Sequence, residues 1–154
     1  MHPRNQAVQD ALTAAGIASR IQVLDEHART AALAAAQLGC EVAAIANSLV
    51  FMADGQPLLV MASGAARVDT DVIASAVGAD SVTKASADQV RAATGQAIGG
   101  VAPTGHPTPL QTLVDPELGA HDTIWAAGGT PDSIVPLTFQ QLVTITAGHV
   151  TPVR

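Results

Sequence analysis

Aromatic residues are almost absent from this sequence of 154 residues. They are Phe51, Trp125 and Phe139, and there is no tyrosine. A surface that binds single-stranded nucleic acid stacks bases on exposed rings, and this chain has little to offer for that. The core must be built mainly from alanine, valine, leucine and isoleucine. Hydrophobic residues make up 48% of the chain, which is typical of a well-buried globular protein.

Positive charge is also scarce. Lys84 is the only lysine, and seven basic residues stand against 13 acidic ones, for a formal net charge of −6. A protein that binds a phosphate backbone along a broad face carries a basic stripe, and none is visible here. We therefore expect no DNA binding, and any contact with RNA to be small, confined to one end and aided by backbone amides. Charge alone favours a small-molecule binder.

Cys40 is the only cysteine, which excludes an internal disulfide and favours a reducing compartment. No stretch reaches the roughly 18 uninterrupted apolar residues of a membrane span, and the first residues contain no apolar targeting segment. We expect no membrane association and a cytoplasmic location. The length fits one domain with its own core, so a single domain over residues 1–154 is predicted.

Apolar periodicity and end signals predict interleaved helices and strands. Asn5 is the expected N-cap of the first helix, and Ser86 with Gln89 forms a capping box in the fourth. Asp54 and Gly55 predict a hairpin turn. The fold class is α/β (α+β), with a mixed, largely antiparallel sheet or partly closed barrel and surrounding helices. The expected helices are 5–16, 30–39, 68–78, 86–95 and 138–148. The expected strands are 21–24, 42–52, 58–63, 110–114, 123–127, 133–137 and 150–153.

The loop TGQAIGGVAPTGH, residues 94–106, is the densest candidate for a site. Gly99 and Gly100 allow close approach of the backbone to a ligand and can turn amide N–H groups outward, while Pro103 stiffens the chain that follows. Such a loop can hold a carbonyl oxygen or a phosphate without a charged side chain. The alternative is an ordinary connecting loop, which is the commoner case for a short motif.

Other groups give weaker signals. His106 is a base, a hydrogen-bond donor or a solvated surface group. His121 and Asp122 make a poor metal site without further ligands, and no metal or cofactor is expected. Cys40 follows a helix C-terminus, where the dipole does not activate a thiol, and Ser63 lacks a G-x-S-x-G context. Any hydrolysis would therefore use water directly.

The strand AAIANSLVFM, residues 43–52, carries an amide and a hydroxyl at Asn47 and Ser48. An amide buried without partners costs roughly 1 to 3 kcal/mol, so Asn47 needs either hydrogen bonds to neighbouring backbone or a place in a site. The sequence pattern alone leaves both readings open.

Several segments, taken in order, resemble the YbaK family of aminoacyl-tRNA deacylases, which is related to the editing domain inserted in bacterial prolyl-tRNA synthetases. The resemblance spans nearly the whole chain, and the combination is more specific than any one motif. It rests on AIANSLVF (44–51), LLVMASGAARVD (58–69), TGQAIGGVAPTGH (94–106), LVDPEL (113–118) and DTIWAAGGTPDSIVPL (122–137).

The resemblance implies hydrolysis of the ester at the 3′ end of a mischarged tRNA, with that 3′ end and a tRNA synthetase as partners. The family's G-x-x-x-P loop, which presents backbone amides to the aminoacyl ester and the terminal ribose, maps onto Gly99 to Pro103. A ribose hydroxyl helps to activate water in related proteins. The implied catalytic positions are Asn47, Gly99, Gly100 and Pro103. The implied substrate-binding positions are Ser48, Ile45, Met61, Val101, Ala102, His106, Gly128 and Gly129.

One departure from the family pattern concerns charge. Asn47 stands where the family has a lysine, and an amide supplies only dipoles where an ammonium neutralises negative charge. Either Asn47 binds substrate in a working variant, with His106 or an arginine taking over the charge, or the protein is a binding module for a small acyl or nucleotide-like ligand. Asp69 and Asp115 match acidic family positions, but a turn or cap role is equally expected.

Overall fold

The computed structural model of the chain describes residues 2–24 and 30–154. His27 lies outside these residues. No helix in the described ranges is long and apolar enough to cross a membrane. The elements are α1 (Pro3–Ala14), β1 (Gln22–Val23), α2 (Ala31–Leu38), the 3₁₀ helix η1 (Val42–Ala44), β2 (Ile45–Ala53), β3 (Gln56–Ser63), α3 (Thr70–Val77), β4 (Val82–Lys84), α4 (Ala87–Thr94), β5 (Gln111–Val114), the 3₁₀ helix η2 (Pro116–Ala120), β6 (Ile124–Ala127), β7 (Ser133–Leu137), α5 (Phe139–Thr146) and β8 (His149–Val150).

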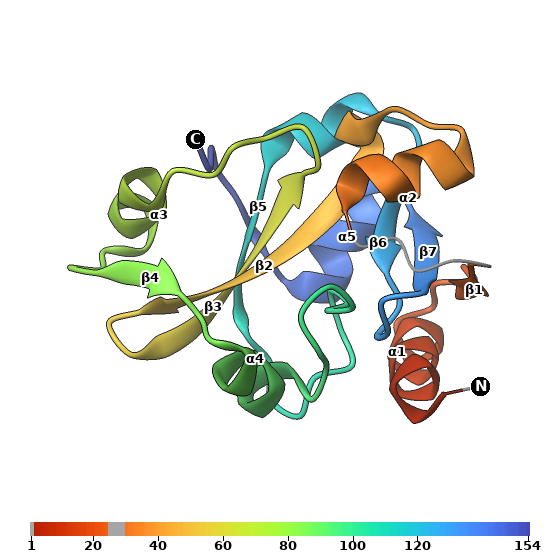
Figure 1. The fold of residues 1–154 in the computed structure, drawn as a ribbon, viewed down its shortest axis with the longest axis horizontal. Helices are drawn as coiled ribbons and strands as arrows, with labels where there is room; N and C mark the ends of the chain where they lie inside the picture. Colours follow the sequence, from red (N-terminus) through yellow and green to blue (C-terminus); the bar gives the residue numbers. More distant parts are fainter. Residues whose placement is uncertain (1, 25–29) are drawn as a thin grey trace.

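Within the described residues, eight strands form one mixed sheet in the order β1-β7-β6-β2-β3-β5-β8, with β4 also paired to β2 (Figure 1). The pairs β1–β7, β2–β3, β2–β4 and β6–β7 are antiparallel, and β2–β6, β3–β5 and β5–β8 are parallel. The predicted α+β fold with a mixed sheet is confirmed. The alternative of a partly closed barrel is wrong, because β1 and β8 end the order without pairing with each other.

Of the helix N-termini predicted at Asn5 and Ser86, the one at Ser86 is confirmed and the one at Asn5 is wrong. The capping box of Ser86 and Gln89 on α4 is confirmed. Asn5 is not an N-cap, because α1 begins two residues earlier, at Pro3, and the side chain of His2 accepts the N–H of Arg4. Proline suits the first helical position, since it has no N–H to satisfy and its φ is already helical. Asn5 instead lies inside the helix and is buried.

The two acidic positions matched to the family pattern are caps in this fold. Asp69 caps α3 by accepting the N–H of Asp71, and Asp115 caps η2 by accepting the N–H of Glu117. The buried carboxylate of Asp115 also accepts the N–H of Ser63 at 3.1 Å, so it ties the end of β3 to β5. Structural roles account for both residues.

The hairpin between β2 and β3 turns at Asp54 and Gly55, with φ of 49° and 82°. Two positive φ values are what a tight two-residue hairpin turn requires. The Asp54 carboxylate also accepts the N–H groups of Asp80 and Ser81, and this holds the start of β4 beside β2. No signal in the sequence indicated β4, because its three residues are largely exposed and form no apolar run.

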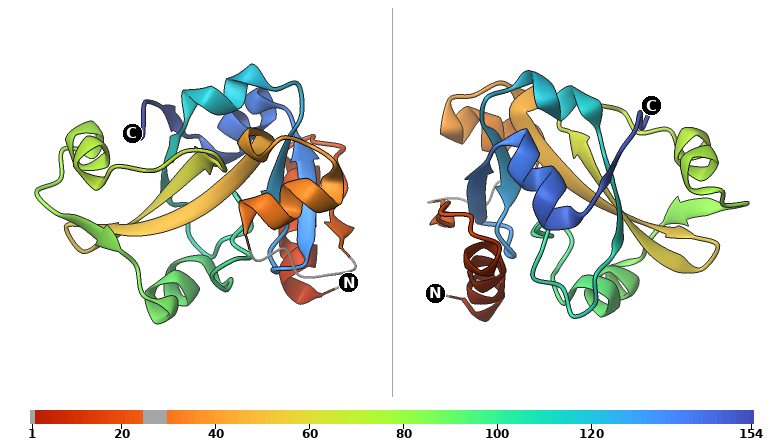
Figure 2. Two further views of the ribbon diagram at one scale, coloured as in Figure 1. Left: turned by 45° about the horizontal axis from the view of Figure 1, so that its top comes forward. Right: turned by 180° about the vertical axis from the view of Figure 1, so that it is seen from behind.

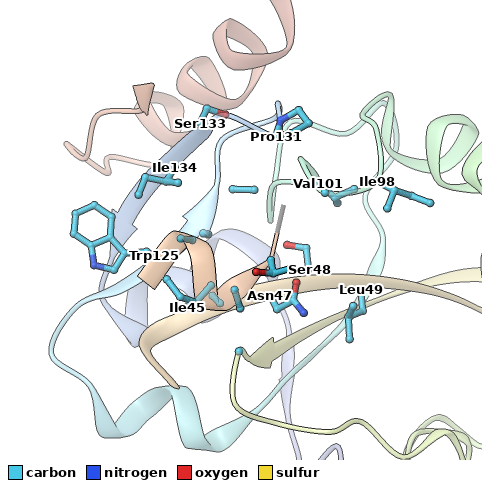
Figure 3. Close-up of a pocket in the computed structure, with 18 of the residues that line it drawn as sticks. Ile45, Asn47, Ser48, Leu49, Ile98, Val101, Trp125, Pro131, Ser133 and Ile134 are labelled. Carbon is cyan, nitrogen blue, oxygen red and sulfur yellow. The ribbon is translucent and has the colours of Figure 1, made fainter. Parts of the chain in front are cut away.

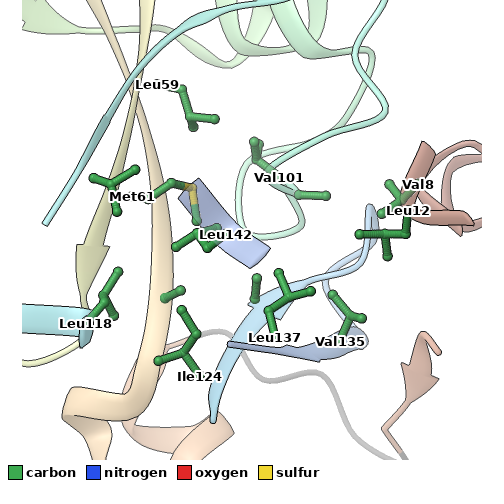
Figure 4. Packing of buried hydrophobic residues seen from close by; sticks show 14 of the residues in the cluster. Val8, Leu12, Leu59, Met61, Val101, Leu118, Ile124, Val135, Leu137 and Leu142 are labelled. Carbon is green, nitrogen blue, oxygen red and sulfur yellow. The ribbon is translucent and has the colours of Figure 1, made fainter. Parts of the chain in front are cut away.

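Side chains alternate between the two faces of the sheet. On β3, Leu59 and Met61 enter the largest apolar cluster with residues of α1, α4 and α5, whereas Leu58 and Val60 enter a second cluster with Ile73 of α3. Figure 4 shows part of the first cluster. Figures 1 and 2 show α2 in front of the sheet and α5 behind it.

The central strand β2 changes partner along one of its edges. It pairs with β6 at Ile45 and Ala46 and with β4 from Phe51 to Ala53. Between these pairings, no described strand lies along this edge over residues 47–49. The sheet therefore has an opening beside the middle of its central strand.

Candidate functional site

A pocket of about 550 Å³ lies at this opening. Figure 3 shows Trp125 and Ile134 on one side of it, Ile98 and Leu49 on the other, and Asn47 and Ser48 between them. The walls come from α2, β2, the loop after α4, and the β6–β7 hairpin. The described lining residues are Thr30, Ala31, Ala32, Ala34, Ile45, Ala46, Asn47, Ser48, Leu49, Gly64, Ile98, Gly99, Val101, Trp125, Ala126, Ala127, Pro131, Ser133 and Ile134.

Asn47 is exposed although it lies in the middle of a central strand. Its side chain makes no hydrogen bond with any described residue, so it does not satisfy neighbouring backbone. The pocket leaves the carboxamide in solvent, which removes the cost of burying it. Ser48 differs, because its hydroxyl donates to the sulfur of Met61 at 3.3 Å. Of the two polar groups in the strand, the amide is therefore the one available to a ligand.

The glycine loop reaches the pocket through Gly99 and Val101. Gly99 has a φ of 89°, and Gly100 donates its N–H to the carbonyl of Ala97 at 3.0 Å, which closes a tight turn. Ala102 donates its N–H to the side chain of Gln96 at 2.8 Å. The expected outward amide of Gly100 is therefore wrong. The N–H groups of Gly99 and Val101 have no partner within the described chain.

The strand edge adds a backbone group that sequence analysis missed. Val50 turns its carbonyl to this edge, where it accepts the N–H of Ala85 at 3.1 Å. Because successive residues of a strand point their backbone groups to opposite edges, Ser48 points its N–H and carbonyl to the same edge as Val50. No described strand lies there to pair with them. Backbone groups have no signature in the sequence, so only the pairing pattern shows that these are open.

Six other predicted substrate-binding or catalytic positions lie away from the lining, and each has a structural reason. Met61 is fully buried beneath Ser48, and Ala102 and Pro103 are buried behind Val101. The glycine at position 128 packs against Ile21 and Ser133, and a side chain there would meet Ile21 at 2.9 Å. A side chain at position 129 would lie 2.9 Å from the carbonyl oxygen of Arg4 on α1. These two glycines admit close approach, but of the protein's own helix and strand rather than of a ligand.

His106, the sixth of these positions, lines a separate pocket of about 240 Å³ together with Pro103, Thr112 and Thr146. Its Nε2 lies 2.8 Å from the carbonyl oxygen of Ala102, and because a carbonyl only accepts, Nε2 carries the proton. Burial lowers the pKa of His106, and the bond to Ala102 offsets only part of this. His106 lies outside the described lining of the main pocket, so its position does not support the prediction that it takes over the charge of the family lysine.

The lowered pKa of His106 predicts how stability depends on pH. Below about pH 6.5, the ordinary pKa of histidine, the unfolded chain binds a proton that the folded chain does not. The contribution of His106 is therefore complete above that pH and declines as the pH falls below it. Replacing His106 with glutamine, which keeps a donor for Ala102, is expected to remove this part of the pH dependence. Urea unfolding of both proteins from pH 5 to 8 measures this dependence. If the free energy of unfolding changes equally with pH in the two proteins, the assignment to His106 is contradicted.

The described lining of the pocket is uncharged. Among the residues described, none that lines it is acidic, basic or a histidine. The described residues also contain no group of three or more side chains suited to hold a metal ion. Cys40 lies outside the lining, and burial raises the pKa of its thiol. The polar groups that the described lining offers are therefore dipoles, which come from an amide, hydroxyls and backbone groups.

One wall of the pocket contains no residue that was predicted from the sequence to belong to a site. The N-terminal end of α2, from Thr30 to Ala34, lies against it, and so does Pro131 of the β6–β7 loop. Residues 30–39 were predicted only as a helix. Ile98 is 58% exposed at the rim, at the second position of the turn that Gly100 closes. Ile98 lies in the loop 94–106 that was predicted as a site, but its exposure is visible only in the structure.

The chain is similar to known proteins over most of its length. A family model described as an aminoacyl-tRNA editing domain matches residues 25–145. The uncharacterized protein YwhH of Bacillus subtilis (strain 168) is 32% identical over 110 residues, which is 71% of this chain and 69% of YwhH. The crystal structure of a candidate trans-editing enzyme for prolyl tRNA synthetase is 36% identical, with a TM-score of 0.94 over 100% of this chain and 98% of that one. The hypothetical protein APE2540 is 27% identical, with a TM-score of 0.88 over 96% of this chain and 98% of its own.

Proposed function

Because the chain belongs to the aminoacyl-tRNA editing domain family, we propose that it hydrolyses the ester between a wrongly attached amino acid and the 3′ end of a tRNA. The reaction would take place in the pocket beside β2, on aminoacyl-tRNA that a synthetase has released. The structural neighbour described as a candidate trans-editing enzyme for prolyl tRNA synthetase supports editing in trans. A prolyl-tRNA synthetase is the natural candidate for the enzyme whose errors are corrected.

The observation that carries this proposal is the meeting of unpaired dipoles in one cavity. The carboxamide of Asn47 and the N–H groups of Gly99 and Val101 come from segments about fifty residues apart, and all three residues line the same pocket. None of these groups has a hydrogen-bond partner in the described chain. Donors left open together in this way suit an acyl carbonyl, whose oxygen becomes negative during hydrolysis.

The proposed reaction uses water as the nucleophile. The oxygen of water attacks the ester carbon, and the proton it loses passes to a hydroxyl of the terminal ribose and then to the leaving oxygen. The carbonyl oxygen gains negative charge while the N–H groups of Gly99 and Val101 and the amide of Asn47 donate to it. The bond between the acyl carbon and the ribose oxygen then breaks, which yields the free amino acid and a tRNA with both ribose hydroxyls restored.

No side chain of the pocket is needed as a nucleophile or base in this scheme. The hydroxyl of Ser48 is hydrogen-bonded to a thioether, which cannot take its proton. With the described lining uncharged, there is also no general base beside it. The roles left to the protein are to orient the ester and to stabilise the developing charge.

A deacylation assay tests the proposal directly. The protein is mixed with tRNAs charged with alanine, serine, cysteine and proline, and loss of the labelled amino acid is followed at neutral pH. We expect at least one mischarged tRNA to lose its amino acid well above the rate in buffer, while correctly charged prolyl-tRNA stays intact. No turnover on any substrate, with the protein folded, would contradict the proposal.

The lack of charge among the described lining residues favours a second candidate function, which is a module that binds a small acyl or nucleotide-like ligand without hydrolysing it. Trp125 is the only tryptophan and lines the pocket, so its fluorescence reports on occupancy. A change in fluorescence with a non-hydrolysable aminoacyl-adenosine, in the absence of any turnover, would support the binding module. Turnover would support the hydrolase.

A further inference from the structure

We infer that Asn5, from the first helix, is a positioning residue that holds two walls of the pocket in register. The inference rests on the proposed function only for its effect on hydrolysis, since the contacts themselves concern the fold. Helix α1 lies outside residues 25–145, the part of the chain that the family model matches. Asn5 neither lines the pocket nor touches its opening.

The side chain of Asn5 is bonded entirely to the loop between β6 and β7. It is 2% exposed, and its Nδ2 lies 2.7 Å from the carbonyl oxygen of Gly128, 3.2 Å from Oγ1 of Thr130 and 3.0 Å from Oγ of Ser133. The buried amide donates its hydrogens to a segment that lies more than a hundred residues away in sequence. These bonds fix that segment relative to α1.

The same loop is closed on itself around this amide. Thr130 donates its N–H to Oγ of Ser133 and its hydroxyl to the carboxylate of Asp132 at 2.7 Å, and Ser133 donates its N–H to the carbonyl of Thr130. Gly128 donates its N–H to the carbonyl of Ser133 at 3.1 Å. Asn5 therefore binds near the centre of a compact turn, and movement of the asparagine would shift the turn as one body.

This turn packs directly against the glycine loop, so its position affects the position of that loop. A side chain at Gly100 would lie 2.6 Å from the carbonyl carbon of Thr130 and 2.7 Å from the nitrogen of Pro131, so the two backbones are in direct contact. Pro131 and Ser133 line the pocket on one side of this contact, and Gly99 and Val101 line it on the other. The line of contacts thus runs from Asn5 through Thr130 to the proposed amide donors.

Gln9 provides a matched control on the same helix. It is 5% exposed, and it binds the carbonyl of Ser19 and the N–H of Ile21, which lie before β1 and outside the pocket lining. Replacing Gln9 with alanine therefore weakens the docking of α1 without removing a bond to the β6–β7 loop. A general loss of helix docking should appear in both variants, and a loss of loop position only in Asn5→Ala.

The test compares Asn5→Ala and Gln9→Ala by hydrogen exchange and by deacylation kinetics. We expect both to lower the melting temperature. Only Asn5→Ala should accelerate exchange at least 10-fold over residues 128–133 and 98–101, and lower kcat about 10-fold with a smaller change in KM. Gln9→Ala should keep both values within about 2-fold of the wild type. Equal exchange of residues 98–101 in the two variants would overturn the inference.

Two further outcomes separate this inference from the proposed function. If the wild type hydrolyses no substrate, the proposed function fails, and the exchange measurement still decides the role of Asn5. If Asn5→Ala does not fold, Thr130→Val removes one acceptor of the same link from the loop side while leaving α1 intact. Faster exchange of residues 98–101 in Thr130→Val would support the inference, and unchanged exchange would overturn it.

Discussion

Replacing Asn47 with lysine is expected to raise kcat for deacylation about 10-fold. A hydrogen bond from an ammonium to a developing negative charge is worth about 1 to 2 kcal/mol more than one from a neutral amide, and about 1.4 kcal/mol corresponds to a factor of ten in rate. The position tolerates the charge, because Asn47 is exposed and the described lining contains no other cation to repel it. Single-turnover hydrolysis of the best substrate from the panel measures the effect.

Glutamine at position 47 is the matched control, since it lengthens the side chain towards the reach of lysine without adding charge. We expect Asn47→Gln to stay within about 3-fold of the wild type. A gain in both variants would show that reach matters and charge does not. No gain with lysine would argue that the pocket serves a ligand other than an aminoacyl ester.

Replacing Gly100 with alanine is expected to lower kcat/KM about 100-fold. The added methyl group would lie 2.6 to 2.8 Å from backbone atoms of Thr130 and Pro131, which cannot move as a flexible side chain would. Overpacking of this kind costs about 1 to 3 kcal/mol in stability, and a displacement of about 1 Å at a catalytic group can cost a factor of 100 in rate. Urea unfolding and deacylation kinetics measure the two effects.

The same substitution at Gly119 of η2 serves as the control, because the atoms nearest to a methyl group there belong to the side-chain ring of Phe139, at 3.3 Å, and not to backbone. Gly119→Ala is expected to leave kcat/KM within about 2-fold of the wild type. A folded Gly100→Ala protein with near-normal activity would show that the packing of the glycine loop on the β6–β7 loop does not set the position of the proposed donors.

Local signals predicted most of the secondary structure, because they depend on neighbours in sequence. The capping box at Ser86 and the turn at Asp54 are each complete within four residues. The strand β4 was missed since its partner, rather than its own composition, makes it a strand. The N-cap at Asn5 was wrong for a related reason, as its amide binds residues that only the fold brings near.

The candidate site was predicted in part for the same physical reason. The motifs pointed to Asn47 and to the glycine loop, and the structure places Asn47, Gly99 and Val101 around one pocket. His106 and Gly129, which were predicted to bind substrate, face another pocket and the protein's own helix respectively. Adjacency in the chain does not decide which side of a loop a residue takes.

The sequence by itself determined the class of fold, the positions of most helices and strands, and the two segments from which a site would be built. The tertiary structure alone decided which donors remain open. The N–H of Gly100 is bonded to the carbonyl of Ala97. The edge of β2 at Ser48 stays unpaired, because β2 pairs with β6 before this residue and with β4 after it. The reason is that a hydrogen bond depends on where both partners lie in space, and strand pairing sets those places over distances that local sequence cannot report.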